Sequence, residues 1–219
     1  MDNNILIFLP VDDIIINDYT GCDTWVNRYK HPPFTELRFS KFTSGGRNYI
    51  NRGTAINKHK WPTVVDIITE YRDIIQKYDY VYLIDNDVRI DNQTLTAFIN
   101  KVTSLNLEIA QMAVHRTNGT HAHLLHRGRK GVVRVKFCEV MAPIIRTDIL
   151  LEMYDKGYLS ESESGWGIDY IWGKFYENWL VQDCVMYHTK KVSSTQWVMS
   201  DGRTPMMELE AIKRKYKIR

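Results

Sequence analysis

The sequence predicts an α/β protein whose central sheet is mixed but mostly parallel, with helices on both faces. Short apolar runs typical of buried strands alternate with longer segments in which apolar residues recur at helical spacing. Parallel strands need crossovers that pack on the sheet, and helices usually supply them. The length of 219 residues and the 44% of apolar residues suit one folded unit with a full core. We therefore expect a single domain over residues 1–219.

The first part of the chain contains two predicted strands and one helix. The run from Ile5 to Val11 is short and apolar, as in a buried first strand. Turn-forming residues dominate 18–33, and the alternation from Glu36 to Thr43 predicts a second strand that Ser44-Gly45-Gly46 ends. From Trp61 to Ile75, apolar residues recur at helical spacing, with proline near the start, where a helix tolerates it.

Residues 80–115 predict a strand, a helix and a second strand. The apolar run from Tyr80 to Ile84 leads into two acidic residues. Asp91 is placed to cap a helix through Leu95 and Val102, and Glu108 to His115 returns as an apolar strand.

The remaining elements follow the same alternation. Residues 116–131 are polar and glycine-rich and predict a lid-like loop, and 132–145 predict a long strand. Thr147 or Asp148 is placed to cap a helix over 149–154, and a further helix runs from 168 to 179. The last predicted strand is 184–188.

The motif Asp85-Asn86-Asp87 is the strongest functional signal. It follows a clean apolar strand, and ligands bind at the carboxyl ends of strands in such sheets. Two carboxylates at this position repel each other unless a cation lies between them. Carboxylate oxygens suit Mn²⁺ or Mg²⁺, which usually binds through a few protein ligands and substrate phosphates. We therefore predict a metal site that receives a nucleoside diphosphate.

A second motif is Ser164-Gly165-Trp166-Gly167-Ile168-Asp169. The glycines would allow the backbone to approach a ligand, and the indole ring of Trp166 offers a face for stacking. Asp169 falls in the first turn of a helix and can accept a proton there. The simpler alternative is a helix cap whose Trp166 packs in the core.

Histidines supply a third signal. His188 ends the last predicted strand, where its imidazole could complete the metal site. His121 and His123 also have a spacing that would suit zinc, but no Cys and no second ligand pair accompany them, and a loop is the better interpretation.

Taken in order, these motifs resemble the metal-dependent glycosyltransferases of the GT-A fold, in the compact form found in bacteria and in large DNA viruses of algae. The resemblance implies that Asp85 and Asp87 bind Mn²⁺ or Mg²⁺ and the nucleotide sugar, that Trp166, Gly167 and Asp169 face the acceptor, and that His188 is the final metal ligand. Where the galactosyltransferase form of the tryptophan motif has Glu-Asp, this chain has Ile168-Asp169.

The same resemblance extends the predicted site. It implies a nucleotide-binding half over 1–115 and an acceptor half over 116–219. It places the nucleoside at the end of the first strand, which makes Leu9, Pro10, Val11 and Asp13 candidate contacts, while Arg47 and Asn86 could reach the ribose or the phosphates. The expected reaction moves a hexose such as glucose, galactose or rhamnose from a UDP-sugar to a glycan, glycoprotein or other hydroxyl acceptor.

Two other functions stay open. Asp85 and Asp87 also fit the start of a haloacid-dehalogenase-like phosphohydrolase, although no later Gly-Asp motif follows. The other alternative is a nucleotide-sugar binding module without catalysis.

Net charge, apolar runs and cysteine spacing further restrict the class of protein. The net charge of +3 is too small to indicate nucleic-acid binding, and no run is long and apolar enough for a transmembrane segment. Three widely spaced cysteines, Cys22, Cys138 and Cys184, argue against a disulfide framework and fit a reducing compartment. We expect a soluble, cytoplasmic protein.

Overall fold

The computed structural model describes residues 5–12, 24–29, 34–43, 46–52, 59–85, 87–117, 120–188, 198–199 and 201–218. Side chains are described for residues 5–7 and, apart from Asn92, for those from residue 59 onward. Within this part of the chain, no helix has the length and apolar character needed to cross a membrane.

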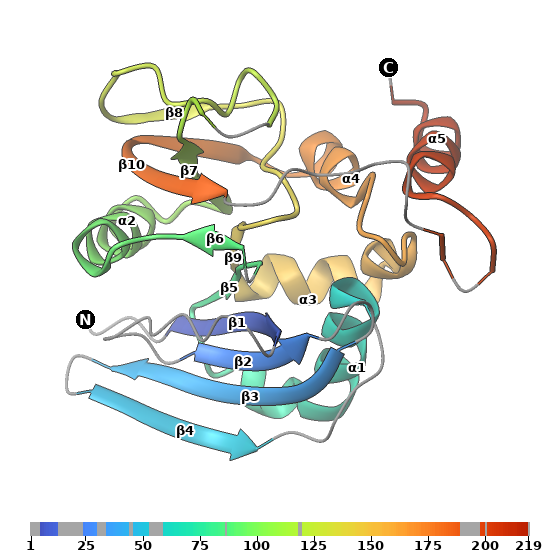
Figure 1. Cartoon of the computed structure of the whole chain (residues 1–219), viewed down its shortest axis with the longest axis horizontal. Coiled ribbons are helices and arrows are strands. Elements are labelled where there is room, and N and C mark those ends of the chain that lie inside the picture. Colours follow the sequence, from blue (N-terminus) through green and yellow to red (C-terminus); the bar gives the residue numbers. More distant parts are fainter. Residues whose placement is uncertain are drawn as a thin grey trace.

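A mixed sheet runs through the molecule in the strand order β4-β3-β2-β1-β5-β9-β7-β10-β6, and β8 pairs with β10 beside this path. Figure 1 shows the strands stacked from β4 at one edge to β10 and β8 at the other end. The strands are β1 (Ile5–Asp12), β2 (Thr24–Tyr29), β3 (Phe34–Thr43), β4 (Gly46–Arg52), β5 (Tyr80–Leu83), β6 (Val88–Arg89), β7 (Ile109–Val114), β8 (Val132–Arg134), β9 (Ile144–Arg146) and β10 (Asn178–His188).

The α/β class and the mixed sheet are confirmed, but antiparallel pairings outnumber parallel ones among the described strands. The parallel pairs are β1 with β2, β1 with β5, and β7 with β10. Hairpin neighbours such as β3 and β4 are antiparallel, and so are the short strands β6, β8 and β9 with their partners.

Helices cover both faces of the sheet, as the sequence predicted. They are α1 (Lys60–Ile75), α2 (Asn92–Ser104), α3 (Thr147–Asp155), α4 (Ile168–Phe175) and α5 (Pro205–Tyr216), with a 3₁₀ turn, η1, at Tyr158–Ser160. In Figure 1, α2 lies on the opposite side of the sheet from α1 and α3.

Alternation along the strands divides the apolar residues between two cores. Tyr82 of β5 packs with Phe98 of α2, with ring centroids 5.6 Å apart, whereas Leu83 belongs to the core that contains Ile68 of α1. Neighbouring residues of a strand point to opposite faces, so one short strand contributes to both cores. Both cores therefore hold β5, and the turn that follows it, in a fixed place.

Several local predictions are confirmed, and others are wrong. Asp91 caps α2, because its carboxylate accepts a hydrogen bond from the Thr94 amide at 2.8 Å. The cap of α3 is instead Arg146, so Thr147 and Asp148 lie inside the helix. The predicted long strand 132–145 is two short strands, β8 and β9, with an irregular segment between them.

Other differences concern where elements begin and end. Helix α4 ends at Phe175, and Trp179 belongs to β10. Strand β2 forms within the segment read as turns, and α5 was not predicted at all. The side chain of Thr204 caps α5, and Pro205 occupies its first turn, so a cap signal was present in the sequence.

Candidate functional site

The two aspartates lie in a turn after β5 rather than on the strand itself. β5 ends at Leu83, and the amide of Val88 donates to the carbonyl of Asp85 at 3.2 Å. Strand β6 then pairs with the end of β10, with Val88 opposite His188. This register brings Asp87 beside His188, which is about a hundred residues later in the sequence.

Asp87 and His188 form the first pair of the site. The Nε2 atom of His188 lies 3.2 Å from Oδ2 of Asp87, and both side chains are largely buried. The hydrogen bond to Asp87, opposed by burial, raises the pKa of His188, and the charges of Asp85 and Glu139 contribute in the same direction. The sequence prediction that His188 and Asp87 meet is confirmed in position.

This pair fits two ligands of a divalent cation. Two neighbouring ligands of an octahedral Mg²⁺, each at about 2.1 Å from the ion, are about 3.0 Å apart. The separation of 3.2 Å is close to that value. Within the described ranges, no group of three or more His, Cys, Asp or Glu is arranged to hold a metal ion. The 3.2 Å separation is also that of the hydrogen bond between the two side chains, and a metal at this pair stays a prediction.

Asp85 has a different partner, Lys60, in the first turn of α1. The ammonium Nζ of Lys60 lies 2.6 Å from Oδ1 of Asp85 and also donates to the carbonyls of Leu83, at 3.1 Å, and Val140, at 2.8 Å. Burial lowers the pKa of Lys60 and raises that of Asp85, while each charge opposes the shift of the other. A predicted metal ligand is thus already neutralised by a cation of the protein itself, and Oδ2 is the oxygen left for a metal.

Lys60 was not predicted as a site residue, although the sequence contains a signal that it needs an acidic partner. A positive charge in the first turn of a helix meets the positive end of the helix dipole, which is unfavourable without an acidic partner. The partner is Asp85, 25 residues further along the chain.

Asp169 is a buried acid in the first turn of α4, as predicted. Its side chain is 5% exposed, and Oδ1 accepts a hydrogen bond from the Tyr170 amide at 3.0 Å. Burial, together with the negative charge of Glu139, raises the pKa of Asp169 to about 8. An acid of this kind holds its proton near neutral pH and becomes a strong base once it loses that proton.

Glu139 is a further acid whose charge acts on both Asp169 and His188. Burial raises its pKa, whereas a hydrogen bond from Thr120 and the nearby charges of His188 and His123 lower it. The Glu139 amide donates to Oε1 of Gln111 on β7 at 2.6 Å, which fixes the backbone at this point. Sequence analysis missed Glu139 because it lies within the run read as a strand, where a lone acid among apolar residues was the available signal.

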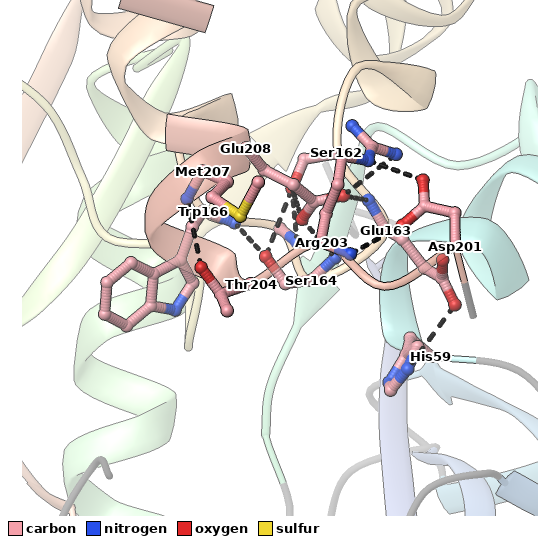
Figure 2. Close-up of polar contacts among 11 residues, drawn as sticks. His59, Ser162, Glu163, Ser164, Trp166, Asp201, Arg203, Thr204, Met207 and Glu208 are labelled. Carbon is pink, nitrogen blue, oxygen red and sulfur yellow. Dashed lines mark hydrogen bonds and ion pairs between the residues drawn. The ribbon is translucent and has the colours of Figure 1, made fainter. Parts of the chain in front are cut away.

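The loop before α4 is held by a buried carboxylate on α5 (Figure 2). Glu208 is fully buried and accepts hydrogen bonds from the Ser162 hydroxyl at 2.8 Å and from the amides of Glu163, at 2.9 Å, and Ser164, at 3.0 Å. Burial works to raise the pKa of Glu208, but these hydrogen bonds lower it on balance. In Figure 2 the indole ring of Trp166 points away from this network. Helix α5 thus positions the loop that carries Trp166.

The glycines of this loop have a different role from the one predicted. Gly165 has φ +90°, and a Cβ atom there would lie 2.2 Å from Cδ1 of Trp61 on α1. Gly167 has φ +95°, and its Cβ would lie 2.8 Å from Cδ1 of Ile212 on α5. Both positions therefore require glycine for close packing against α1 and α5 rather than against a ligand.

The structure also describes the two loop histidines and two of the three cysteines considered above. The rings of His121 and His123 both pack edge-on against Phe137, at centroid distances of 4.8 and 4.7 Å, as expected for a structural role. Cys138 and Cys184 are buried free thiols, and Cys22 lies outside the described residues.

The predicted nucleoside contacts are described only in part. Leu9, Pro10 and Val11 belong to β1, and Arg47 belongs to β4 rather than to a loop, all with backbone positions alone. Asp13 and Asn86 lie outside the described residues. Because β1 and β5 are parallel neighbours, the carboxyl end of β1 lies at the same edge of the sheet as Asp85.

Taken together, the fold and the site define an α/β protein with an acidic site at the carboxyl edge of its sheet. A family profile described as "Protein of unknown function (DUF707)" matches residues 54–143, which include Lys60, Asp85, Asp87 and Glu139. No curated protein matches the chain.

Two solved structures have a similar arrangement of the chain. One is described as "Crystal Structure of A197 from STIV", with 12% identity, a TM-score of 0.45 and 85% of each chain covered. The other is the S. aureus TarS fragment 1–349 in complex with UDP-GlcNAc, with 11% identity, a TM-score of 0.46, and coverage of 88% of this chain and 61% of the fragment. At these values the similarities carry no information on function.

Proposed function

We propose that this protein is a glycosyltransferase that moves a hexose from a UDP-sugar to a hydroxyl group of a glycan or glycoprotein, with Mn²⁺ or Mg²⁺ as cofactor. The observation that carries the proposal is the Asp87–His188 pair, coupled through Glu139 to the buried acid Asp169. It combines a partial cation site with a proton acceptor at the sheet edge where ligands bind.

In this proposal Asp87 and His188 hold the metal, and Asp85 contributes through Oδ2 while Lys60 keeps its other oxygen in place. The bound cation would neutralise the diphosphate of the donor and of the leaving group. Lys60 adds a fixed positive charge beside the same turn. The backbone end of β1 and the turn at Asp85 would receive the nucleoside.

The acceptor hydroxyl needs a group that takes its proton, and two carboxyls are available. Asp169 has the pKa expected of a base that works near pH 8. The negative charge that helps to raise this pKa is that of Glu139. Asp169 is our assignment, because its raised pKa matches it to the transfer of a proton. If so, the rate of transfer increases with pH up to about pH 8.

The test is an assay of UDP release from a panel of UDP-hexoses with Mn²⁺, with and without glycan acceptors. The wild-type chain should release UDP slowly without an acceptor and faster with one. Asp87→Ala should abolish release. Asp169→Asn should reduce turnover about 10²-fold or more while UDP binding persists, and Glu139→Gln should reduce it less. Asp155→Asn, which alters an exposed carboxylate paired with Arg72, is the matched control.

The two alternatives give different results in the same assay. A phosphohydrolase would use Asp85 as nucleophile and would release phosphate from monophosphates without an acceptor. In such an enzyme Asp87 would be the acid or base, but in the structure the Asp87 carboxylate contacts His188. A binding module would retain UDP and Mn²⁺ but release no product. Either outcome would refute the transferase assignment.

A further inference from the structure

A second pocket is lined in part by Tyr170, the residue after Asp169, and has no assigned role in the site described above. It has a volume of about 300 Å³, which is at the lower end of the range for small-molecule sites. Its walls include Lys136 and Phe137 from the segment after β8, Tyr170 and Lys174 from α4, and Lys217 at the end of α5.

Aromatic rings form one wall of this pocket. Phe137 and Tyr170 are stacked, with centroids 4.6 Å apart and planes at 30°. Phe137 is 3% exposed and is held from behind by the rings of His121 and His123. The wall is therefore rigid, and a ligand can lie against its exposed part, which is the partly exposed Tyr170, without ordering a mobile side chain.

The charged residues that line the pocket are all positive. They are Lys136, Lys174 and Lys217, and the described lining contains no acidic residue. Lys213 adds a fourth ammonium, 5.3 Å from the ring centroid of Tyr170, although Glu210 lies 3.3 Å from it. Ammonium groups gathered around one hollow repel one another, and a bound anion relieves that repulsion.

The pocket lies next to the proposed site of proton transfer. Tyr170 directly follows Asp169, and Phe137 is two residues before Glu139. His123 contacts Phe137 and is also one of the charges that act on Glu139. Tyr170 thus links the pocket to the first turn of α4, which carries the proposed base, although Asp169 itself does not line the pocket.

We propose that this pocket binds the acceptor, and that the acceptor is a saccharide carrying an anionic group such as phosphate, sulfate or carboxylate. The sugar ring would lie on the Phe137–Tyr170 wall, and its anionic group would meet the ammonium groups of Lys136 and Lys217. The inference rests on the proposed glycosyltransferase function, since it names the substrate class of that site.

Binding can be tested without donor or metal, which separates this inference from the proposed function. The probes are glucose 6-phosphate, glucose 6-sulfate, glucuronate and neutral glucose, measured by ligand-observed NMR. At least one anionic probe should bind more tightly than glucose. Lys136→Gln/Lys217→Gln should weaken that binding about tenfold or more. Lys77→Gln/Lys130→Gln removes two exposed lysines that do not line the pocket and should leave binding unchanged.

Further measurements identify which part of the scheme fails. Saturating UDP with Mn²⁺ should not displace the anionic probe, and Lys136→Gln/Lys217→Gln should keep its response to UDP. Displacement by UDP would assign the pocket to the donor and overturn the inference. So would equal binding of glucose and the anionic probes, equal losses in the two double variants, or tighter binding of oligouridylate than of any sugar. If the probes bind as expected but no sugar transfer occurs, the proposed function fails and the anion pocket remains.

Discussion

Burial determines what Asp169 can do. A carboxyl that is 5% exposed and lies near a second acid favours the neutral form, so its pKa rises to about 8. A helix cap would need no such environment, since exposed aspartates such as Asp91 cap helices with a lowered pKa. Asp169 therefore differs from an exposed helix cap, and its role as the base stays a proposal.

The same pKa predicts how stability depends on pH. Folded Asp169 keeps its proton up to about pH 8, whereas the unfolded chain releases it near pH 4, so unfolding releases a proton between these values. Stability should therefore fall as pH rises through this window, with a contribution of up to about 1.4 kcal/mol per pH unit. Asp169→Asn should remove that contribution. In urea unfolding, the stability of this variant relative to the wild type should therefore increase from pH 5 to pH 8. Parallel curves for the two proteins would show that Asp169 titrates normally.

Lys60 is the second residue whose partners define its role. Its ammonium has four oxygen acceptors, and it is the described cation that neutralises Asp85 directly. Because Asp85 remains 33% exposed, Lys60→Met should cost about 2–3 kcal/mol in urea unfolding, less than a fully buried pair. Adding Asp85→Asn should recover part of this loss. Lys156→Met, which breaks an exposed helix pair with Glu152, should cost about 0.5 kcal/mol or less.

At the scale of elements, periodicity predicted the long helices and the buried strands well. The helix from Lys60 to Ile75 and the strand from Ile109 to Val114 bury the residues that the pattern assigned to the core. Periodicity failed where an apolar run serves two short strands. Residues 135–143 are buried in part without strand pairing, because they pass beneath α4 and carry Glu139 into the site. Apolar character predicted burial there, but it could not predict the backbone.

Helix α5 was missed because its apolar residues are few, yet it holds the loop before α4 through Glu208. Glu208→Gln should destabilise the protein by about 1–3 kcal/mol near neutral pH, since one acceptor oxygen becomes a donor facing other donors. The lowered pKa means that this stabilisation is present above about pH 4.5 and is lost as the pH falls through the folded pKa of Glu208. The deficit should therefore shrink in acid. Hydrogen exchange at the Glu163 and Ser164 amides should also speed up, whereas Glu210→Gln on the same helix should change neither.

At the scale of the molecule, the sequence predicted the places of the candidate residues better than it predicted how they meet. Asp87, His188 and Asp169 were identified from local patterns, and the structure brings the first two within 3.2 Å. Lys60 and Glu139 were missed because their roles depend on partners far along the chain. Only the pairing of β6 with β10 and the packing of α1 against β5 bring these residues together. Local patterns reveal a residue type at a strand end, but non-local register decides its partner.

This assembly predicts that donor and metal stabilise the whole fold only together. Lys60 neutralises Asp85, but the charge of Asp87 still repels a diphosphate, so UDP alone should raise the melting temperature little. Among the described residues, Mn²⁺ alone finds an incomplete ligand set. With both at about 100 times their dissociation constants, the gain should be about 2.7 kcal/mol. Asp87→Ala and His188→Ala each remove one member of the Asp87–His188 side-chain pair but keep the backbone pairing of β6 with β10, and should lose this response while remaining folded. Asp155→Ala should keep it. A response to UDP without metal, or one that survives Asp87→Ala, would place the diphosphate elsewhere on the molecule.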